Sequence, residues 1–417
     1  MTGELEVPGD KSISHRAAIL GAIAQGQTHV RGFLEGEDCL HTLQCLSALG
    51  VRIEKIQPGE YLIHGNGLQG LAEPDDILDV GNSGTTIRLL AGLLASLPFT
   101  SILTGDASIR SRPMDRVIVP LTQMGATIFG RKNNKLAPLS IRGGNLKGID
   151  YQLPVASAQV KSAILLAALG ASGPTSVREP LPSRDHTERM LAAFGARILV
   201  QNQRIHIEPQ EALVPQEILV PGDISSAAFF MVAASIIPGS NIYIRNVGVN
   251  PTRTGIITAL QAMGASVTIK NYREQAGEPV ADLQVQHAPL RGITFQPEWI
   301  PTLIDEIPAL CAAAACAEGV TVIRHAQELR VKETDRIRIM TQELTKFGVK
   351  VQELPDGMII EGGAKLKGAS CCSHGDHRIA MALAVLGLRA TGITTVGQAE
   401  AVKVSFPDFF ETLESLR

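Results

Sequence analysis

The 417-residue chain is poor in aromatic residues, which make up 4% of it, and it holds a single tryptophan. Its 6 cysteines form no Cys-x-x-Cys pair, so the sequence disfavours a disulfide framework and a zinc site and predicts buried free thiols in a reducing compartment. No apolar run reaches the roughly 18 residues of a membrane span, and no signal peptide opens the chain. We therefore expect a soluble, cytoplasmic protein that does not bind a membrane.

Charge of one sign is also lacking, because the net charge is −3 and neither a basic block nor an acidic tail occurs. This balance argues against nucleic acid as a partner. The sequence has no Gly-x-x-x-x-Gly-Lys-Ser/Thr loop and no Gly-x-Gly-x-x-Gly after a strand, so nucleotide binding is unsupported. A metal site at 374–377 is disfavoured because Arg378 would repel a cation. A triad of Ser12, His15 and Asp10 is disfavoured too, since no nucleophile elbow is present.

What the chain does have is a unit that recurs about every 70 residues. Its clearest mark is a leucine followed four positions later by a glycine, and an alternating apolar run follows. The glycine is typical of a helix C-cap with positive φ, and the alternating run predicts a strand. The five segments are 46–50, 121–125, 191–195, 260–264 and 344–348.

Each unit also contains a second helix that is apolar nearly all round. A helix without a polar face must be buried on all sides. A short extended segment precedes most of these helices and a strand follows most of them. The six segments are 17–24, 87–97, 163–171, 227–237, 307–317 and 379–388.

Six units divide into three plus three, and the length of the chain also predicts two domains of roughly 200 residues each. We expect an N-terminal lobe at 11–220 and a C-terminal lobe at 1–10 plus 221–417, with hinge crossings near 9–11 and 220–223. The last unit ends before its final strand, so the first residues are expected to complete the C-terminal half. Two crossings suggest a hinged enzyme that closes on its ligand.

Polar residues gather in the first turn of each buried helix. Helix N-termini carry unpaired N–H groups and a partial positive charge, so added hydroxyls and cations make an anion site there. Plain N-capping accounts for Asp223 and Ser157. It does not account for Lys11, Arg16 or Arg88, because a cation opposes the dipole at a helix start, so a bound anion is expected. The segments are 11–16, 82–88, 157–161, 223–226, 305–306 and 376–378.

Two loops add further charge, at 110–115 and at 330–336. Either loop alone could be a run of charged residues on the solvated surface, but both lie at the same place in the repeat, which favours a role in the functional site. Acids stand beside bases there, and Asp305, Glu333 and Lys332 are candidates for moving protons.

From Val7 to the C terminus these motifs resemble those of the enolpyruvyl transferases, and among them the shikimate branch, the EPSP synthase family. The resemblance implies two domains, each of three βαβαββ units with helices buried inside the sheets, an inside-out α/β barrel-like arrangement with a six-fold pseudo-repeat. The motifs that carry it are 8–12, 81–86, 111–114, 330–336, 376–378 and 403–408.

Two alternative functions are weighed against this one. The sister family, which acts on UDP-N-acetylglucosamine, has Lys-Asn where this chain has Lys11 and Ser12, and a catalytic cysteine where this chain has Ala107. A non-catalytic ring clamp on nucleic acid would need a basic inner surface and would have no reason to place acids beside cations. We favour transfer of the enolpyruvyl group of phosphoenolpyruvate to the 5-hydroxyl of shikimate 3-phosphate, in aromatic amino-acid biosynthesis.

The resemblance also implies the residues of the site. Asp305 would take the proton of the 5-hydroxyl, and Glu333 with Lys11 would handle the methylene proton, although the sequence leaves open which group protonates the methylene. The residues implied for shikimate 3-phosphate are Lys11, Ser12, Arg16, Ser157, Ala158, Gln159, Ser183, Asp305 and Lys332. Those implied for phosphoenolpyruvate are Lys11, Gly84, Arg112, Gln159, Arg336, Arg378 and Lys403.

Three departures from the family pattern concern these assignments. Ala158 stands where many members have serine, so one phosphate contact there would come from the backbone alone. The segment 184–187 differs from another pattern that is common among family members. Leu89 follows Arg88 where some members have proline. No metal or organic cofactor is implied, because the enol ether supplies its own reactivity, and a monomer is expected.

Overall fold

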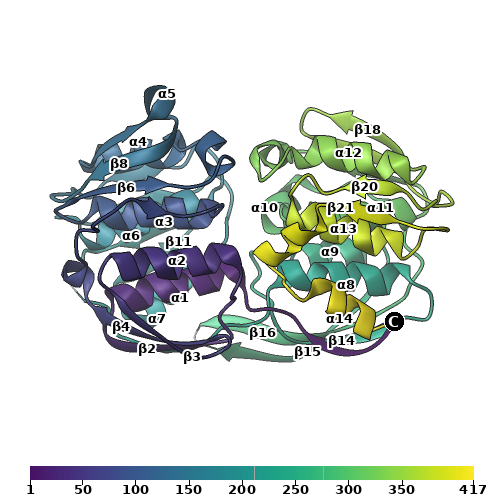
Figure 1. The fold of residues 1–417 in the computed structure, drawn as a ribbon, viewed down its shortest axis with the longest axis horizontal. Helices are drawn as coiled ribbons and strands as arrows, with labels where there is room; N and C mark the ends of the chain where they lie inside the picture. Colours follow the sequence, from purple (N-terminus) through teal and green to yellow (C-terminus); the bar gives the residue numbers. More distant parts are fainter. Residues whose placement is uncertain (211, 276) are drawn as a thin grey trace. The chain divides into compact units, whose positions relative to one another are not determined.

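The computed structural model describes residues 1–210, 212–275 and 277–417, which fall into two compact units (Figure 1). The N-terminal unit consists of Gly9–Val220 with Gln275–Glu278. The C-terminal unit consists of Met1–Pro8, Pro221–Glu274 and Pro279–Arg417.

This division differs from the predicted lobes at two places. Gly9 and Asp10 group with the N-terminal unit, because the Asp10 carboxylate caps the first helix by accepting the N–H of Ile13 at 2.9 Å. Gln275–Glu278 also groups with that unit, because the buried Glu278 carboxylate lies 2.8 Å from Nδ1 of His186. A buried contact between residues so distant in sequence leaves no local pattern that could reveal it.

The N-terminal unit contains three four-stranded sheets of one design. In each sheet the first pair of strands is parallel and the other two pairs are antiparallel. Each repeat of the sequence therefore corresponds to one such sheet with its helices. The sheets are β13 (Glu217–Leu219), β2 (Gln25–Arg31), β4 (Glu60–Asn66) and β3 (Arg52–Gln57); β5 (Leu78–Asp79), β6 (Thr100–Thr104), β8 (Leu136–Arg142) and β7 (Thr127–Gly130); and β9 (Asp150–Gln152), β10 (Thr175–Arg178), β12 (Arg204–Ile207) and β11 (Ile198–Gln201).

The C-terminal unit repeats the design less regularly within its described residues. Its first sheet also begins with a parallel pair followed by an antiparallel pair, whereas the second is joined by isolated parallel bridges at Arg291 and Thr294 in place of a leading strand. The sheets are β1 (Thr2–Glu6), β14 (Asn241–Gly248), β16 (Glu278–Gln286) and β15 (Ser266–Gln275); β17 (Val320–Ile323), β19 (Gly357–Glu361) and β18 (Lys350–Leu354); and β20 (Ser370–Cys372) with β21 (Thr395–Gly397).

The two units exchange their leading strands. β1 precedes the first buried helix of the N-terminal unit but pairs in parallel with β14, and β13 precedes the first buried helix of the C-terminal unit but pairs in parallel with β2. The chain changes units directly after each of these strands. Gly9 and Gly32 lie where a Cβ would collide with a carbonyl oxygen, of Gly32 and Val220 respectively, so the backbones can approach only because both residues are glycine.

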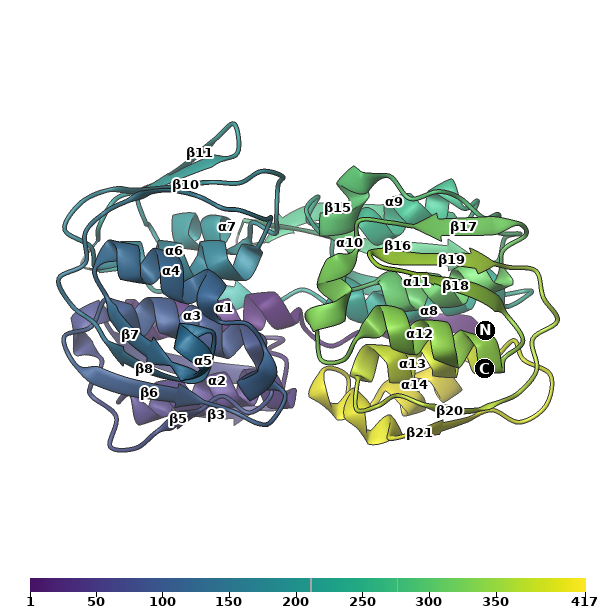
Figure 2. The same cartoon turned by 90° about the horizontal axis from the view of Figure 1, so that it is seen from above.

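Six helices lie inside the units, covered by the sheets, as β2, β3 and β4 cover α1 in Figure 1. They begin up to six residues before the predicted apolar runs, because polar first turns and their caps belong to the same helices. Gly92 permits close packing of α3 on α6, since a Cβ there would collide with the backbone of Ala163 (Figure 2). The buried helices are α1 (Lys11–Ile23), α3 (Gly84–Ala95), α6 (Ala158–Leu169), α8 (Ile224–Ile236), α11 (Ile307–Cys316) and α13 (His377–Gly387).

The amphipathic helices alternate with the buried ones along the chain. The five glycines predicted to cap the first five of them all have positive φ, from 81° at Gly195 to 113° at Gly125, so the predicted caps are confirmed. The helices are α2 (Glu37–Ala48), α4 (Asp115–Met124), α7 (His186–Ala193), α9 (Gly255–Ala262), α12 (Arg336–Lys346) and α14 (Phe409–Ser415), with short α5 (Arg131–Asn134) and α10 (Ile300–Leu303). The 3-10 turns are η1 (Leu68–Gly70), η2 (Ile109–Ser111), η3 (Pro297–Trp299), η4 (Gln327–Val331) and η5 (Ala399–Val404).

Buried apolar side chains form two clusters, one in each unit. Alanine dominates the inner helices, which explains how a chain so poor in aromatics fills its cores. All six cysteines are free as predicted, but Cys316 and Cys372 are only half-buried because they lie at the end of α11 and on the edge strand β20.

Among the described residues no single helix is both long enough and apolar enough to cross a membrane. The helix pair Pro297–Leu303 and Ile307–Cys316 reaches that length and apolarity only when the two helices are counted together, and the pair is bent by 118°.

Candidate functional site

In the N-terminal unit the first turns of α3 and α6 are joined by Gln159. Its Oε1 accepts a hydrogen bond from Nη1 of Arg88 at 2.8 Å, and its Nε2 donates to Oγ1 of Thr85 at 3.0 Å. Arg88 also donates to the main-chain oxygen of Pro113 at 3.1 Å, which ties α3 to the charged loop before α4. Three predicted polar segments, 82–88, 110–115 and 157–161, are therefore one structural cluster.

Gly84 opens α3 between two guanidinium groups. A Cβ on Gly84 would lie 2.9 Å from Nη1 of Arg88 and 3.0 Å from Nη1 of Arg112. Arg112 is buried, and its Nη2 donates to Oδ1 of Asn82 at 2.8 Å and to Oγ of Ser108 at 3.1 Å. The helix N-terminus and two cations meet at a residue without a side chain, which is the arrangement that binds a phosphate.

Lys11 begins α1 and forms an ion pair with Asp38 of α2. The expectation that a cation at this helix start requires a bound anion is therefore wrong in part, because a carboxylate of the chain itself supplies negative charge. Asp38 is itself buried, and its Oδ1 has no hydrogen-bond partner among the described residues. The pair holds the Lys11 side chain at the first turn of α1.

Arg16 lies one turn further along α1 and is 4% exposed. Its Nε donates to Oγ1 of Thr187 at 2.6 Å, its Nη2 to Oγ of Ser162 at 2.8 Å, and its Nη1 to the main-chain oxygen of Ser12 at 2.8 Å. Burial lowers the pKa of Arg16 to about 10, although Glu188 acts in the opposite direction. The guanidinium is therefore charged at neutral pH and held by neutral partners, which leaves its charge available to an anion.

The remaining predicted residues of this unit lie at the start of α6 and before α7. Ser157 caps α6, its Oγ accepting the N–H of Val160 at 3.4 Å, and Ala158 is the first helical residue. Ser183 is buried, and its hydroxyl donates to Oε1 of Glu179.

In the C-terminal unit the cations and acids of 305–306, 330–336 and 376–378 form a second cluster around Arg336. Arg336 is 1% exposed, and its Nε and Nη2 lie 2.8 Å and 3.2 Å from the two oxygens of Asp376. Its Nη2 also donates to Oε2 of Glu333 at 2.6 Å. Burial opposes the charge of Arg336, yet Asp376 and Glu333 raise its pKa above the ordinary value. Burial likewise opposes the charge of Asp376, and the Arg336 guanidinium lowers its pKa below the ordinary value.

Asp305 lies in the turn between α10 and α11, at the edge of this cluster. Its Oδ1 is 3.1 Å from Nζ of Lys332 and 3.5 Å from Nη1 of Arg336. Its main-chain oxygen accepts a hydrogen bond from Nη1 of Arg378 at 3.0 Å. Lys403 is exposed on η5, and among the described residues no hydrogen bond joins it to Asp305 or its partners.

Two clusters of guanidinium, ammonium and carboxylate groups at helix starts are what a protein needs to hold small, strongly acidic molecules and to move protons on them. Comparison with known proteins identifies the family to which the chain belongs. Residues 1–413 match the family model of EPSP synthase (3-phosphoshikimate 1-carboxyvinyltransferase). The chain belongs to the EPSP synthase family.

Individual relatives agree with this result over the full length. A 3-phosphoshikimate 1-carboxyvinyltransferase of Desulforamulus reducens is 57% identical over 416 residues, covering 100% of this chain and 97% of its own. One of Bacillus cereus is 54% identical over 417 residues, covering 100% and 97%. The solved EPSP synthase of Acinetobacter baumannii superposes with a TM-score of 0.89 at 50% identity, covering 100% of this chain and 95% of that one. The predicted family, the mixed α/β two-domain fold class and the enzyme class are confirmed.

Several polar partners of the predicted residues were not assigned from the sequence. Asp38 faces Lys11, and Arg88 holds Gln159. Asp376 joins Arg336 and also caps α13 by accepting the N–H of Arg378 at 3.0 Å. For Asp38 and Asp376 the sequence signal is charge balance, because a buried cation is often paired with a carboxylate.

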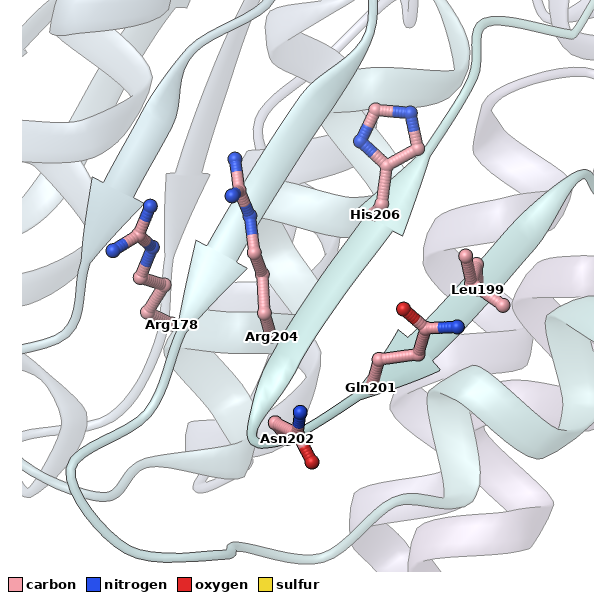
Figure 3. A pocket seen from close by; sticks show the side chains of 6 residues that line it. All are labelled: Arg178, Leu199, Gln201, Asn202, Arg204 and His206. Atoms are coloured by element: carbon pink, nitrogen blue, oxygen red, sulfur yellow. The ribbon is translucent and has the colours of Figure 1, made fainter.

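A hollow elsewhere in the N-terminal unit has none of these properties. It lies on the solvent-facing side of β10, β11 and β12 (Figure 3). Its two arginines, Arg178 and Arg204, both form ion pairs with Asp150. None of the predicted site residues lines it. In the described part of the chain no three His, Cys, Asp or Glu side chains are grouped so that they could hold a metal ion.

Proposed function

We propose that this chain transfers the enolpyruvyl group of phosphoenolpyruvate to the 5-hydroxyl of shikimate 3-phosphate and releases phosphate, with the two clusters above as its binding and catalytic groups. Both substrates carry a phosphate and a carboxylate, so several negative charges must be held at once. The observation that carries the proposal is the Asp305 carboxylate, held within 3.5 Å of both Lys332 and Arg336. A base positioned among cations is suited to an acidic substrate.

The reaction is an addition followed by an elimination. The methylene carbon of phosphoenolpyruvate gains a proton, and the 5-hydroxyl oxygen bonds to the neighbouring carbon while it loses its own proton. The intermediate then expels phosphate as its methyl group loses a proton, and the carbon–carbon double bond is restored. Each step moves a proton, so the reaction needs an acid and a base that act in opposite senses.

The contacts of each group support its proposed role. Asp305 takes the proton of the 5-hydroxyl, and the contacts with Lys332 and Arg336 hold its carboxylate in place. Glu333 and Lys11 exchange the methylene proton; each lies beside a partner of opposite charge, Arg336 and Asp38.

The binding roles divide along the same lines, because fixed donors suit phosphate and carboxylate groups. Shikimate 3-phosphate is held by Lys11, Ser12, Arg16, Ser157, Ala158, Gln159, Ser183, Asp305 and Lys332. Phosphoenolpyruvate is held by Lys11, Gly84, Arg112, Gln159, Arg336, Arg378 and Lys403.

Three further properties belong to the same proposal. The enzyme works as a monomer in the cytoplasm, and its partners are the two small substrates, with neither nucleic acid nor membrane involved. No cofactor takes part in the steps above, because the enol phosphate of phosphoenolpyruvate already provides an electrophilic carbon once it is protonated.

The deciding experiment measures phosphate released from phosphoenolpyruvate by the purified chain. We expect release that depends on shikimate 3-phosphate and is absent when UDP-N-acetylglucosamine replaces it. Release that depends on UDP-N-acetylglucosamine, or no release with either acceptor, would contradict the proposal. Thermal unfolding adds a binding measurement, in which shikimate 3-phosphate raises Tm and duplex DNA does not.

A further inference from the structure

Three ionisable side chains lie buried in the N-terminal unit and have no part in the proposed chemistry. They are Lys161 of α6, Glu179 directly after β10, and Glu188 of α7, with side chains 1%, 4% and 5% exposed. Nζ of Lys161 lies 2.7 Å from Oε2 of Glu179 and 2.7 Å from Oε1 of Glu188. The ammonium therefore joins a helix, a strand end and a second helix at one point.

One side of this cluster holds Ser183, which the proposed function assigns to shikimate 3-phosphate. Oε1 of Glu179 accepts a hydrogen bond from the hydroxyl of Ser183. Nζ of Lys161 lies 3.5 Å from the main-chain oxygen of Ser183. Both the side chain and the backbone of Ser183 are thus attached to the ion cluster.

The other side of the cluster reaches Arg16. Ser162 and Thr187, the sequence neighbours of Lys161 and Glu188, are hydrogen-bonded to each other at 2.6 Å and to Arg16 at 2.8 Å and 2.6 Å. The ion pair between α6 and α7 sets the distance between these two hydroxyls. It therefore also sets the position of the guanidinium that they hold.

The cluster of Lys161, Glu179 and Glu188 is not an efficient way to stabilise the fold. Burial opposes the charge on Lys161, although Glu188 and Glu179 raise its pKa above the ordinary value. Burial raises the pKa of Glu188, whose Oε2 has no hydrogen-bond partner among the described residues. Apolar side chains of similar volume would fill the same space at no cost of desolvation, so three buried charges indicate a requirement for fixed geometry.

We propose that Lys161, together with Glu179 and Glu188, is a positioning residue that fixes Ser183 and Arg16 in the arrangement that binds shikimate 3-phosphate. The inference rests on the proposed function. None of the three side chains touches a substrate, and their effect on the reaction passes through the two residues they hold. Phosphoenolpyruvate is assigned to other groups of this unit, such as Gly84 and Arg112, so the cluster acts on one substrate only.

The test compares steady-state kinetics for both substrates in variants of the full chain. Lys161→Met keeps the length of the side chain and removes the ammonium, and Glu179→Gln keeps the shape and removes one charge. In each variant we expect KM for shikimate 3-phosphate to rise at least about tenfold, the effect of one misplaced charged hydrogen bond. KM for phosphoenolpyruvate and kcat are expected to change less than about threefold. Lys161→Arg retains the charge and is expected to recover part of the loss.

Lys346→Met is the control, because it removes a partly exposed lysine from a buried glutamate, Glu343, that belongs to the C-terminal unit. It is expected to leave KM for shikimate 3-phosphate unchanged. Should Lys161→Met fail to fold, Glu179→Gln decides the matter. An equal rise of both KM values, or an unchanged KM for shikimate 3-phosphate in the folded variants, would overturn the inference. A wild-type chain without shikimate 3-phosphate-dependent turnover would instead refute the proposed function.

Discussion

The guanidinium of Arg336 faces the carboxylate of Asp376 with two hydrogen bonds, Nε to Oδ2 at 2.8 Å and Nη2 to Oδ1 at 3.2 Å. Asp376 is completely buried and also caps α13 through the N–H groups of Arg378 and Ile379. One carboxylate therefore joins the starts of α12 and α13. The arrangement fixes the direction in which Arg336 and Arg378 present their charge.

Asp376→Asn should destabilise the protein by about 3 kcal/mol, because a buried guanidinium loses its closest negative charge. Asparagine preserves the shape and the capping oxygen, so the loss reports on the charge. Urea unfolding of the two proteins measures it. Glu361→Gln, which removes the carboxylate from an exposed pair with Lys350, should change stability by less than about 0.5 kcal/mol. Equal stabilities of Asp376→Asn and wild type would show that Glu333 and Asp305 suffice to hold Arg336.

Lys11→Ala and Asp305→Ala should each lower kcat at least about a hundredfold, the scale of losing an acid–base or charge-stabilising group. Asp305→Asn should lose as much while keeping the shape of the turn. Phosphate release at saturating concentrations of both substrates is the measurement. Lys350→Ala, an exchange at an exposed residue, should keep full activity. Near-normal turnover in Lys11→Ala and Asp305→Ala would show that other groups move the protons.

The periodic part of the fold could be predicted from the sequence because it is local. The cap at Gly125 and the buried helix that starts at Gly84 each depend on residues within one or two turns. Their repetition in every unit strengthened each single prediction. The N-caps formed by Ser157 and Asp223 were predictable for the same reason, and the structure shows both.

What the sequence could not reveal is the long-range pairing of ionisable side chains. Asp38 and Lys11, Glu278 and His186, and Glu188 and Lys161 are each brought together by the tertiary fold. The sequence shows that cations stand at helix starts, but only the fold shows that carboxylates of the chain accompany many of them. Part of the positive charge is therefore already balanced before any substrate binds.

Gly84→Ala should raise KM for phosphoenolpyruvate by about tenfold or more, equivalent to at least about 1.4 kcal/mol of binding free energy. The added Cβ would lie 3.0 Å from Nη1 of Arg112 and occupy the space that a phosphate needs at the helix start. Alanine is favourable inside a helix, so the fold should persist. Steady-state kinetics measure both KM values, and that for shikimate 3-phosphate should change little.

Gly173→Ala is the control for this exchange, because a Cβ at Gly173 would meet no atom within 4 Å. It should leave both KM values as they are. An unchanged KM for phosphoenolpyruvate in Gly84→Ala would show that the phosphate binds elsewhere than between Arg88 and Arg112.

His15 gives the stability a dependence on pH. The ring is fully buried, with Nδ1 2.7 Å from Oγ1 of Thr42. Burial lowers its pKa well below the ordinary value, and the nearby Lys11 and Arg16 act in the same direction. The neutral ring is therefore favoured in the folded state, whereas the unfolded chain takes up a proton near pH 6.5. The resulting stability is present above that pH and is lost as the pH falls, with a slope approaching about 1.4 kcal/mol per pH unit.

Urea unfolding of wild type and of His15→Asn between about pH 7.5 and pH 5.5 isolates this effect, since those values bracket the ordinary histidine pKa. The wild type should lose more stability than the variant, and the difference should grow as the pH falls. His325→Asn corrects for the loss of one histidine, because His325 is exposed and its φ of 61° is one that asparagine adopts readily. Parallel pH profiles for wild type and His15→Asn would contradict this account, because they would show that folding does not lower the pKa of the His15 ring.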